Sequence, residues 1–331
     1  MSPHSMIEAE GLTKRYGETQ ALAGVDFSVP AGTILGVLGP NGAGKTTAVK
    51  ILTTFARPDS GRATVAGYDV VTQAAEVRRH IGVAAQDATL DALLTGRQNL
   101  MLIGELSRMT RSASKARATE LLEQFDLTFA ADRVMKGYSG GMRRRLDLAA
   151  SMMTRPPVLF LDEPTTGLDP AARQGMWEVI RELVSGGVTT LLTTQYLDEA
   201  DTLADRIVVI DHGQVIAQGT PRELKEASKG ARLEVTLAEA HSDAVSALQQ
   251  LVEGRVQVSE DGRVLSAGVD NSPGLATTVV RALDQAGVLV DNIEVRQPSL
   301  DDVFFSLTGR PVDEPDPSAD PADIVLEGAH A

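Results

Sequence analysis

The chain has 331 residues, of which 43% are hydrophobic and 23% are charged, and its formal net charge at pH 7 is −14. This length fits about two domains, and the apolar fraction is large enough for packed cores, so a wholly disordered chain is excluded. The sequence has no cysteine. Disulfide scaffolds, thiolate metal sites, iron–sulfur clusters and thiol nucleophiles are therefore excluded, and a reducing compartment suits the chain.

The apolar segments are short. The longest runs, such as residues 158–161, fall far below the roughly 20 residues that a membrane span needs. Residues 1–10 are acidic and contain no apolar core of the kind that signal peptides have. We therefore expect neither a membrane span nor a signal peptide, and any work at a membrane would need a second chain that crosses it.

Charge is unevenly distributed along the chain. Residues 1–230 contain 25 Lys and Arg against 27 Asp and Glu, whereas residues 231–331 contain 6 against 18. This change predicts a domain boundary near residue 230. The acidic C-terminal part would repel phosphates, so we expect no nucleic-acid partner; a solvated acidic surface is the simpler explanation of its charge.

The N-terminal part alternates between short apolar segments and helical segments. We expect buried strands at residues 34–38, 158–161, 189–193 and 206–210, and helices at 45–55 and 171–183. Continuous apolar strands between helices are typical of a mostly parallel sheet covered on both faces, which is an α/β fold. Residues 91–155 have no strand pattern and are rich in Leu, Met, Arg and Ala, which predicts a helical insertion in domain 1–230.

Residues 231–310 predict a small α+β domain. The expected order is a strand at 232–237, a helix at 242–253, a hairpin turning at 260–262, a helix at 275–286 and a strand at 288–295. This order resembles a split βαβ unit. Ser299 can cap a last helix with Asp302 as its capping partner. Residues 311–331 contain four prolines, six acidic residues and no Lys or Arg, and we expect them to be disordered.

A glycine-rich segment follows the first predicted strand and opens a predicted helix. It fits the pattern G-x-x-x-x-G-K-[ST] of a phosphate-binding loop in its proper strand–turn–helix context. Glycines let backbone N–H groups converge on phosphate oxygens, and the helix N-terminus adds partial positive charge. The segment is Gly39-Pro40-Asn41-Gly42-Ala43-Gly44-Lys45-Thr46-Thr47. Lys45 can bind the β- and γ-phosphates, and the Thr46 hydroxyl is placed for Mg²⁺.

Two carboxylates end the predicted strand at 158–161. Strand alternation sends Asp162 and Glu163 in different directions. One of them can serve Mg²⁺ through water, and the other can orient or deprotonate an attacking water. Together with the phosphate loop, the pair predicts nucleoside triphosphate hydrolysis.

Further segments resemble the nucleotide-binding domains of ABC-type ATPases. Residues 138–142, Tyr-Ser-Gly-Gly-Met, are close to the Leu-Ser-Gly-Gly-Gln signature of that family, and Gln86 stands where the family has its Q-loop glutamine. Residues 167–170 match the D-loop, and Tyr16 matches the aromatic residue that stacks on adenine. These elements follow the family's order over residues 1 to about 225. The chain thus resembles an ABC transporter nucleotide-binding subunit, with the P-loop NTPase fold.

Residues 192–201 and 297–304 are similar to the daunorubicin-resistance ATP-binding subfamily, whose members form exporters with a separate membrane subunit. Two positions depart from the wider family. Gln195 stands where most ABC ATPases have histidine, and Met142 replaces the last signature residue. A carboxamide forms hydrogen bonds as an imidazole does but does not titrate. We expect Gln195 to keep the histidine's positioning role.

The resemblance implies a role for each of these residues. Tyr16 would stack on adenine, the loop from Gly39 to Thr47 would hold the phosphates, and Lys45 would take part in catalysis. Thr46 and Gln86 would bind Mg²⁺, with Asp162 acting through water, and Glu163 would be the general base. Gln195 would sense the γ-phosphate. The bound nucleotide would also contact Ser139, Gly140 and Gly141 of the signature and Asp169 of the D-loop.

The resemblance also implies partners. In the family, ATP on one phosphate loop is covered by the signature of a second domain, and this chain has one of each, so a C₂ homodimer is the economical solution. The implied function is an ATPase subunit at the cytoplasmic face of the cell membrane that drives efflux of an amphipathic drug, such as daunorubicin or doxorubicin, through a separate permease. The alternatives are a soluble ABC ATPase acting on ribosomes or DNA, an importer or lipid-exporter ATPase, and a drug-binding immunity factor.

Three features are interpreted as ordinary packing or surface. Arg143-Arg144-Arg145 is read as a solvated or partner-facing helix surface, because the aromatic residues of single-strand binding sites are missing. Trp177 is interpreted as a core or half-buried residue of its helix. Phe304 and Phe305 are interpreted as ordinary packing of the last helix, with a surface for the dimer partner or a regulator as the alternative. The five histidines have no metal-ligand spacing.

Overall fold

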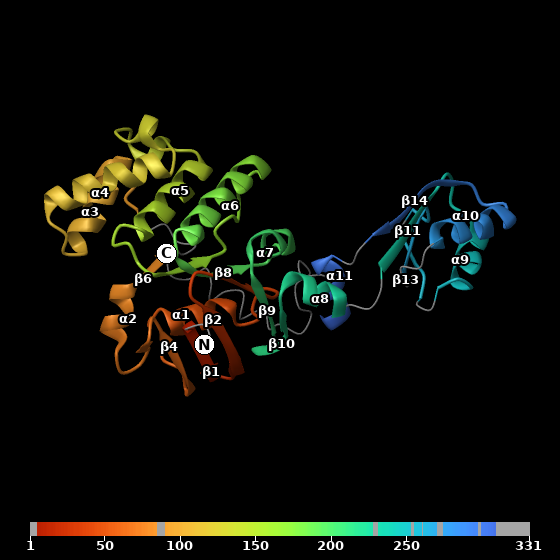
Figure 1. Cartoon of the computed structure of the whole chain (residues 1–331), viewed down its shortest axis with the longest axis horizontal. Helices are drawn as coiled ribbons and strands as arrows, with labels where there is room; N and C mark the ends of the chain where they lie inside the picture. The colour runs from red at the N-terminus through yellow and green to blue at the C-terminus, as the bar shows by residue number, and fades with distance from the viewer. Residues whose placement is uncertain are drawn as a thin grey trace. The chain divides into compact units, whose positions relative to one another are not determined.

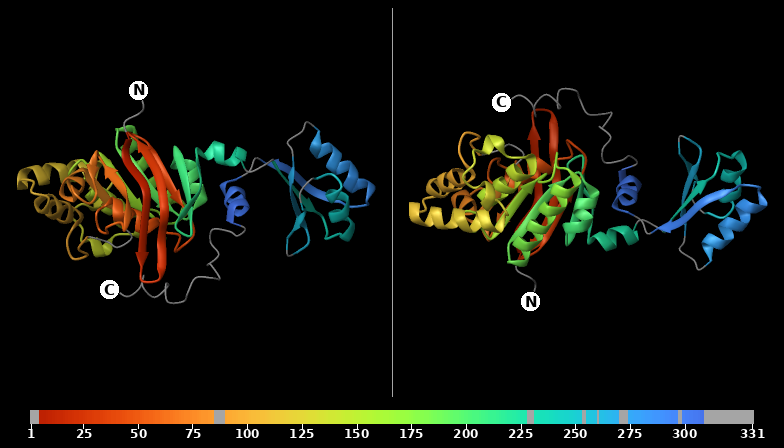
Figure 2. Two further views of the ribbon diagram at one scale, coloured as in Figure 1. Left: turned by 90° about the horizontal axis from the view of Figure 1, so that it is seen from below. Right: turned by 90° about the horizontal axis from the view of Figure 1, so that it is seen from above.

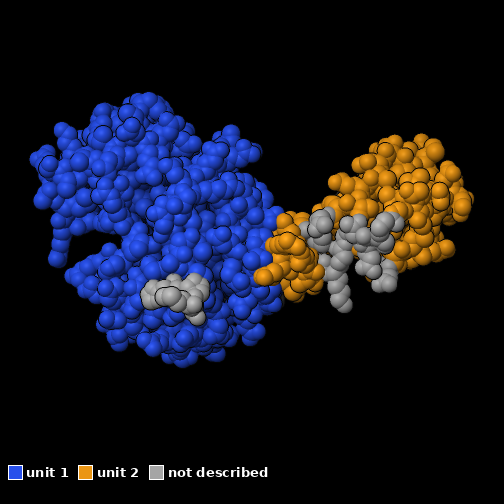
Figure 3. All heavy atoms as spheres, in the orientation of Figure 1, with its two compact units in different colours: residues 1–221, 312–331 blue, residues 222–311 orange. Residues whose placement is uncertain are grey.

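The computed structural model describes residues 5–84, 90–227, 231–252, 255–259, 261–269, 274–296 and 299–308. These residues fall into two compact units that divide between residues 221 and 222 (Figure 3). The domain boundary predicted from the change in charge lay near residue 230, a few residues further along the chain. Each unit has its own sheet and its own buried apolar core.

The first unit is built on a six-stranded sheet with the order β10-β9-β3-β8-β7-β6 (Figure 1). All neighbouring strands are parallel except β10 and β9. β3, β7 and β8 are buried at every residue, as expected for a sheet covered on both faces. The strands are β3 (Ile34–Leu38), β6 (Ile81–Ala84), β7 (Val158–Asp162), β8 (Thr189–Thr194), β9 (Arg206–Asp211) and β10 (Gln214–Gly219).

A second, antiparallel sheet of the first unit was not predicted from the sequence. Its order is β2-β1-β4-β5, with β1 (Ser5–Tyr16), β2 (Thr19–Pro30), β4 (Ser60–Val65) and β5 (Tyr68–Asp69). Helix α1 (Lys45–Leu52) contacts β2 and β4 of this sheet and β7 of the parallel sheet. Its apolar side chains join those of both sheets in one buried cluster. The phosphate loop that precedes α1 is thereby fixed between the two sheets.

Helices cover the other face of the parallel sheet. α7 (Leu197–Leu203) contacts β3 and β8, α5 (Gly140–Ser151) contacts β6, and α6 (Pro170–Ser185) contacts both helices. Figure 2 shows this layering, with the red β1–β2 hairpin in front in one view and the green helices in front in the opposite view. The expected α/β class is confirmed. α1 ends at Leu52 rather than near residue 55, because Thr53 forms its C-cap and Thr54 has a positive φ of 68°.

Residues 90–157, between β6 and β7, are helical throughout apart from their loops. They form α3 (Gly96–Leu106), α4 (Arg111–Gln124), α5 and two short 3₁₀ helices at Thr128–Ala130 and Met135–Gly137. α3 packs on α4, and both contact α5. α2 (Ala74–His80) precedes β6, and α8 (Pro221–Ala227) follows β10. None of the helices in the described part of the chain is long and apolar enough to cross a bilayer.

The second unit is a βαββαβ fold, as the sequence predicted. Its antiparallel sheet has the order β12-β13-β11-β14, and α9 and α10 pack on each other. The elements are β11 (Ala231–Leu237), α9 (Ser242–Gln249), β12 (Gln257–Val258), β13 (Val264–Val269), α10 (Leu275–Gln285), β14 (Val290–Arg296) and α11 (Leu300–Thr308). The prediction of a helix to residue 253 was wrong, because the chain turns after α9 and the Gln249 carboxamide accepts a hydrogen bond from the Val256 N–H. β14 begins two residues later than predicted.

An ion-pair network anchors α11 within the second unit. The Ser299 hydroxyl accepts from the Asp302 N–H at 3.2 Å, and the Asp302 carboxylate accepts from the Ser299 N–H at 2.9 Å, which confirms the predicted capping box. Asp302 also lies 2.6 Å from Arg232 and 3.4 Å from Arg296. Burial alone would raise the pKa of Asp302, but the Ser299 hydrogen bonds and the two arginines hold that pKa below its usual value.

We predict that Asp302→Ala loosens α11. A carboxylate with a lowered pKa stabilises the folded state above its ordinary pKa of about 3.9, and this stabilisation is lost as the pH falls through the folded-state pKa. At pH 7 the expected loss is about 2 kcal/mol, typical of hydrogen bonds to a charged group. Hydrogen exchange of the α11 amides in the full chain measures it. Asp301→Ala, at an exposed neighbouring position, is the matched control, and equal loss of protection in both variants would contradict the network's role.

Candidate active site

Three adjacent parallel strands bring the predicted site residues to one edge of the sheet. β8 lies between β3 and β7, and the register pairs Leu38 with Thr194 and Asp162 with Thr193. The phosphate loop follows β3, Gln195 follows β8, and Glu163 follows β7. In α/β sheets the ligand site lies beyond the carboxyl ends of the strands, and this edge holds all three elements.

The phosphate loop passes so close to its neighbours that two of its glycines have no room for a side chain. A Cβ atom on Gly39 would lie 2.2 Å from the Ile210 carbonyl oxygen. A Cβ on Gly44 would lie 2.4 Å from the Ala21 carbonyl oxygen, and Gly44 has a φ of 109°, which side-chain-bearing residues avoid. The loop is thus held between the end of β9 and the start of β2.

Lys45 begins α1 and is buried at 5% exposure. Its ammonium donates to the carbonyl oxygens of Gly39 at 2.7 Å and Pro40 at 3.0 Å. A buried positive charge on the loop, at the positive end of a helix, is suited to an anionic ligand. Thr46 and Thr47 are half-buried in the same first turn. The loop therefore fits the phosphates of a nucleotide, and the Thr46 hydroxyl fits a hard cation held beside them.

Tyr16 lies at the turn of the β1–β2 hairpin, where it pairs with Thr19. Ala21, two residues further along β2, is the residue that packs against Gly44. The hairpin end is therefore beside the phosphate loop. The Tyr16 ring is 47% exposed, and the Lys14 ammonium lies 5.4 Å from its centroid, so a face of the ring is accessible to a planar base.

Asp162 and Glu163 are both buried. The Asp162 carboxylate accepts a short hydrogen bond from the Thr193 hydroxyl. Glu163 has a positive φ of 49°, and its N–H donates to the Thr193 carbonyl oxygen at 3.0 Å. The Glu163 carboxylate accepts a hydrogen bond from the Thr166 hydroxyl at 3.2 Å, and a positive φ at a residue with a side chain is a form of backbone strain that clusters at functional sites.

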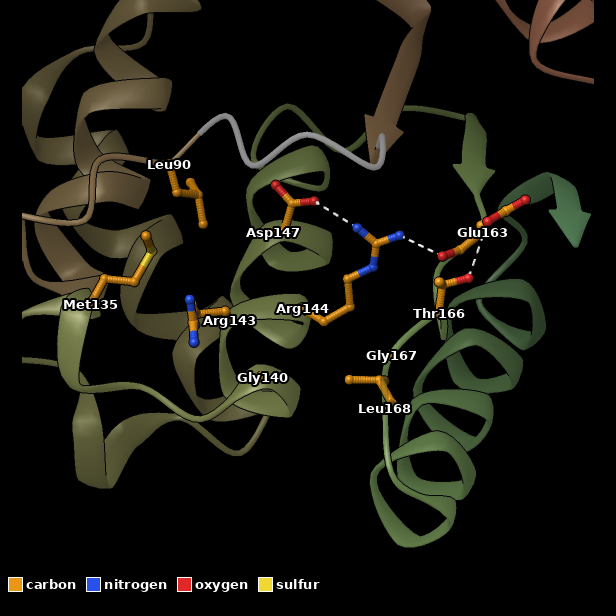
Figure 4. A pocket seen from close by; sticks show the side chains of 10 residues that line it. All are labelled: Leu90, Met135, Gly140, Arg143, Arg144, Asp147, Glu163, Thr166, Gly167 and Leu168. Carbon is orange, nitrogen blue, oxygen red and sulfur yellow. Dashed lines mark hydrogen bonds and ion pairs between the residues drawn. The ribbon is translucent and has the colours of Figure 1, made fainter. Parts of the chain in front are cut away.

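Arg144 holds the backbone of this turn, and the interpretation of residues 143–145 as a solvated surface was wrong for it. Its guanidinium donates to the carbonyl oxygens of Asp162 at 3.0 Å, Glu163 at 2.7 Å and Pro164 at 2.8 Å. Figure 4 shows the contact with Glu163. Asp147 lies 3.9 Å from the same guanidinium. Burial lowers the pKa of Arg144, and the surrounding carboxylates oppose that change; the group stays charged. Arg143 is exposed.

A cavity of about 530 Å³ lies between α5 and the loop after Glu163 (Figure 4). Its apolar lining comes from Leu90, Met135 and Leu168, and Arg144 and Glu163 lie on its polar side. This hollow separates α5 from the loop that follows Glu163, and Arg144 bridges the two.

The signature residues open α5. Ser139 is the N-cap, and its hydroxyl accepts from the Met142 N–H at 3.2 Å. Ser139 and Gly140 are exposed, and Gly141 is partly exposed, so the N–H groups of the helix start are presented outward. Tyr138 is buried, and its hydroxyl donates to the Ala130 carbonyl oxygen at 2.6 Å. Met142 is half-buried.

The remaining predicted residues are Asp169, Gln195 and Gln86. Asp169 is the N-cap of α6, where its carboxylate accepts from the Ala172 N–H at 2.9 Å. Gln195 is half-buried at the end of β8. Gln86 lies outside the described residues. Within the described ranges, no three His, Asp or Glu side chains gather as a metal cluster.

Sequence reasoning missed Arg144 and Thr193. Arg144 and Asp147 are three residues apart on a helix, and such a pair of opposite charges on one face is a weak signal of a shared partner. Thr193 stands in a strand whose other residues are also buried, so only the register of β7 and β8 identifies it as the partner of Asp162.

Comparisons with known proteins agree with this geometry. The profile of the ABC transporter family matches residues 22–166, and the profile for the C-terminal domain of DrrA1-3-like ATP-binding proteins matches residues 219–308. The daunorubicin resistance ATP-binding protein DrrA2 of Streptomyces coeruleorubidus is 54% identical over 92% of this chain and 95% of its own length. The daunorubicin/doxorubicin resistance ATP-binding protein DrrA of Streptomyces peucetius is 47% identical over 94% and 95%.

A solved structure extends the likeness to the fold. The protein cbiO1 of Clostridium perfringens, part of the ABC transporter complex cbiONQ, matches 68% of this chain and 93% of its own chain with a TM-score of 0.63 and 26% identity. The sheet edge, the phosphate loop and the signature helix all belong to the first unit of this chain, which is an ATP-binding domain of the same kind. The chain therefore belongs to the ABC transporter family, as an ATP-binding ATPase subunit of the group that carries the DrrA-like C-terminal domain.

Proposed function

We propose that this chain hydrolyses MgATP as a head-to-tail homodimer and drives export of an amphipathic drug of the daunorubicin and doxorubicin class through a separate permease. The observation that carries the proposal is the meeting of the phosphate loop, the Asp162–Glu163 pair and Gln195 at the ends of three adjacent strands. The drug class is taken from the relatives, which are named for resistance to these compounds.

Nucleotide binding is assigned to the loop and the hairpin. Tyr16 stacks on adenine, and the loop from Gly39 to Thr47 holds the phosphates, with the Lys45 ammonium exchanging its loop carbonyls for phosphate oxygens. The Thr46 hydroxyl, Gln86 and Asp162 would hold Mg²⁺, with Asp162 acting through water. The cation, when bound, neutralises phosphate charge. The buried Thr193–Asp162 hydrogen bond keeps that carboxylate pointed along the sheet edge.

Hydrolysis is assigned to Glu163 and Gln195. Glu163 accepts a proton from the attacking water, and Gln195 positions that water or the γ-phosphate through its carboxamide. A general base must keep a fixed orientation toward its water, because small displacements of a reacting group lower the rate steeply. Arg144 supplies this rigidity, since it bonds three successive carbonyl oxygens at the turn that carries Glu163.

The second copy completes each site. One chain presents one phosphate loop and one signature, and the signature helix shows its N-terminal N–H groups at the surface. In the proposed dimer, Ser139, Gly140 and Gly141 of one copy cover the γ-phosphate on the loop of the other copy, and the D-loop with Asp169 lies at the same interface. ATP then joins the two copies, and hydrolysis releases them.

We propose that the permease is a separate polypeptide chain and that the ATPase dimer binds its cytoplasmic face. The tests below separate the ATPase from the exporter.

We predict that Glu163→Gln abolishes steady-state ATP hydrolysis and leaves ATP binding intact. The amide keeps the size of the side chain but does not accept the proton. Bound ATP should therefore hold the dimer together, which sedimentation with and without MgATP measures. Full hydrolysis by this variant would contradict the role of Glu163, and a monomer at saturating ATP would contradict the ATP-joined dimer.

We predict that Arg144→Gln lowers kcat by about tenfold or more, because the Glu163 turn loses its buried anchor. Binding of ATP should change little, since the hydrogen bonds of Arg144 go to the carbonyl oxygens of residues 162–164, beside Glu163. Arg143→Gln, the exposed neighbour, is the matched control and should keep the parent kcat. Equal values of kcat in the two variants would contradict the proposal that Arg144 supports the catalytic position of Glu163.

We predict that the chain purified from its native membranes in mild detergent carries a stoichiometric partner with several hydrophobic spans. Cells that hold both chains should accumulate less doxorubicin than cells in which the ATPase is the Glu163→Gln variant. Recovery of the chain with ribosomes, or in the soluble fraction alone, would contradict its proposed role in an exporter. The proposed ATPase activity would be unaffected by that result.

A further inference from the structure

One face of α6 contacts the segment that follows Gln195. Arg173, Trp177 and Arg181 are spaced four residues apart, so they lie on the same face of the helix. Each of them contacts the chain between Tyr196 and Thr202. α6 therefore binds α7 and its preceding residue along three successive turns.

The contact nearest to Gln195 is the stack of Arg173 on Tyr196. The guanidinium carbon lies 4.4 Å from the centroid of the Tyr196 ring, and the same guanidinium is 3.4 Å from the Asp198 carboxylate. The side chains of Arg173 and Tyr196 are half-buried. A guanidinium over an aromatic face is held by the negative face of the ring as well as by dispersion.

The two other contacts lie further from Gln195. The Trp177 indole donates to the Glu199 carboxylate at 3.1 Å, and the Arg181 guanidinium donates to the Thr202 carbonyl oxygen at 3.2 Å. Glu199 is fully buried, and burial raises its pKa. These contacts, together with buried Leu197, Ala200 and Leu203, keep α7 on the unit when Arg173 is changed.

Gln195 is thus held from both sides along the chain. Before it, Thr194 is a buried residue of β8, and the Thr194 hydroxyl accepts from the Tyr196 N–H at 3.0 Å. After it, Tyr196 is pinned by Arg173. With two anchored neighbours, the backbone of Gln195 has little freedom, so these anchors fix the point from which its carboxamide extends.

We propose that Arg173 is a positioning residue for ATP hydrolysis, acting through the Tyr196 ring on Gln195. This inference rests on the role proposed for Gln195 above. Because α6 begins at the Asp169 cap, the same helix also connects the D-loop to the segment that carries Gln195. Arg173 contacts Tyr196 and Asp198, beside Gln195, so its effect falls on turnover rather than on ATP binding.

The first test compares four variants of the full chain by steady-state ATPase kinetics. Arg173→Met and Tyr196→Leu should each lower kcat by about tenfold, while KM for ATP stays within about twofold. Tyr196→Phe keeps the aromatic face and should retain the parent kcat. Arg181→Met, on the same face of α6 but far along the helix from Gln195, is the matched control and should also retain it.

Two results of that comparison would overturn the inference. One is a parent-like kcat in Arg173→Met. The other is an equal loss in Arg181→Met, which would show that α6 merely supports α7. Thermal midpoints of all four variants are measured alongside, and a loss of kcat that follows the loss of thermal stability across the series would likewise contradict positioning.

The second test places Arg173→Met in a Gln195→Ala background. If Arg173 acts through Gln195, the double variant turns over ATP at the rate of Gln195→Ala alone. A further multiplicative loss in the double variant would overturn the inference and leave the role of Gln195 intact. A parent-like rate in Gln195→Ala, with Gln195→His as its conservative comparison, would instead remove the proposed role of Gln195, and the inference with it.

Discussion

The pairing of β8 between β3 and β7 is the constraint on which the active site depends. Parallel pairing aligns the carboxyl ends of these strands, so the phosphate loop, Gln195 and Glu163 need no long connections to meet. The strands are buried at every residue, so both faces of the sheet are packed and a slip of register would disturb close packing on both sides. The core of the domain and the position of its chemistry are therefore set by the same hydrogen bonds.

The strand ends bring the loops together, but arginines from the outer helices hold those loops still. Arg144 of α5 binds three carbonyl oxygens around Glu163, and Arg173 of α6 stacks on the residue after Gln195. Lysine would serve poorly in either place, because only the planar guanidinium offers several donors in fixed directions and a flat face for stacking. The two side chains extend the rigidity of the sheet into the turns beyond it.

The sequence predicted those parts that depend on local pattern. The apolar runs of β3, β7, β8 and β9, the phosphate loop and the Ser299–Asp302 capping box were all found within a residue or two, because each is encoded by neighbours along the chain. The β1–β2 hairpin and its sheet were missed, and so was the burial of Arg144. Both depend on partners far away in sequence: β1 pairs with β4, which lies beyond β2, β3 and α1 in the chain, and Arg144 finds its acceptors at residues 162–164. An arginine run looks the same in sequence whether it meets water or carbonyl oxygens.

Helix α5 serves two different contacts with its first two turns, one proposed with the other copy and one observed within its own chain. Its N-terminus presents Ser139 and the first N–H groups outward, and one turn later Arg144 binds the Glu163 turn of its own chain. In the proposed dimer, the first turn meets the γ-phosphate bound by the other copy. A rigid helix transmits a shift at one turn to the next, since core packing leaves it little room to deform. Loss of a γ-phosphate in one site would therefore be felt at the Glu163 turn that serves the other site, through a single helix and a single guanidinium.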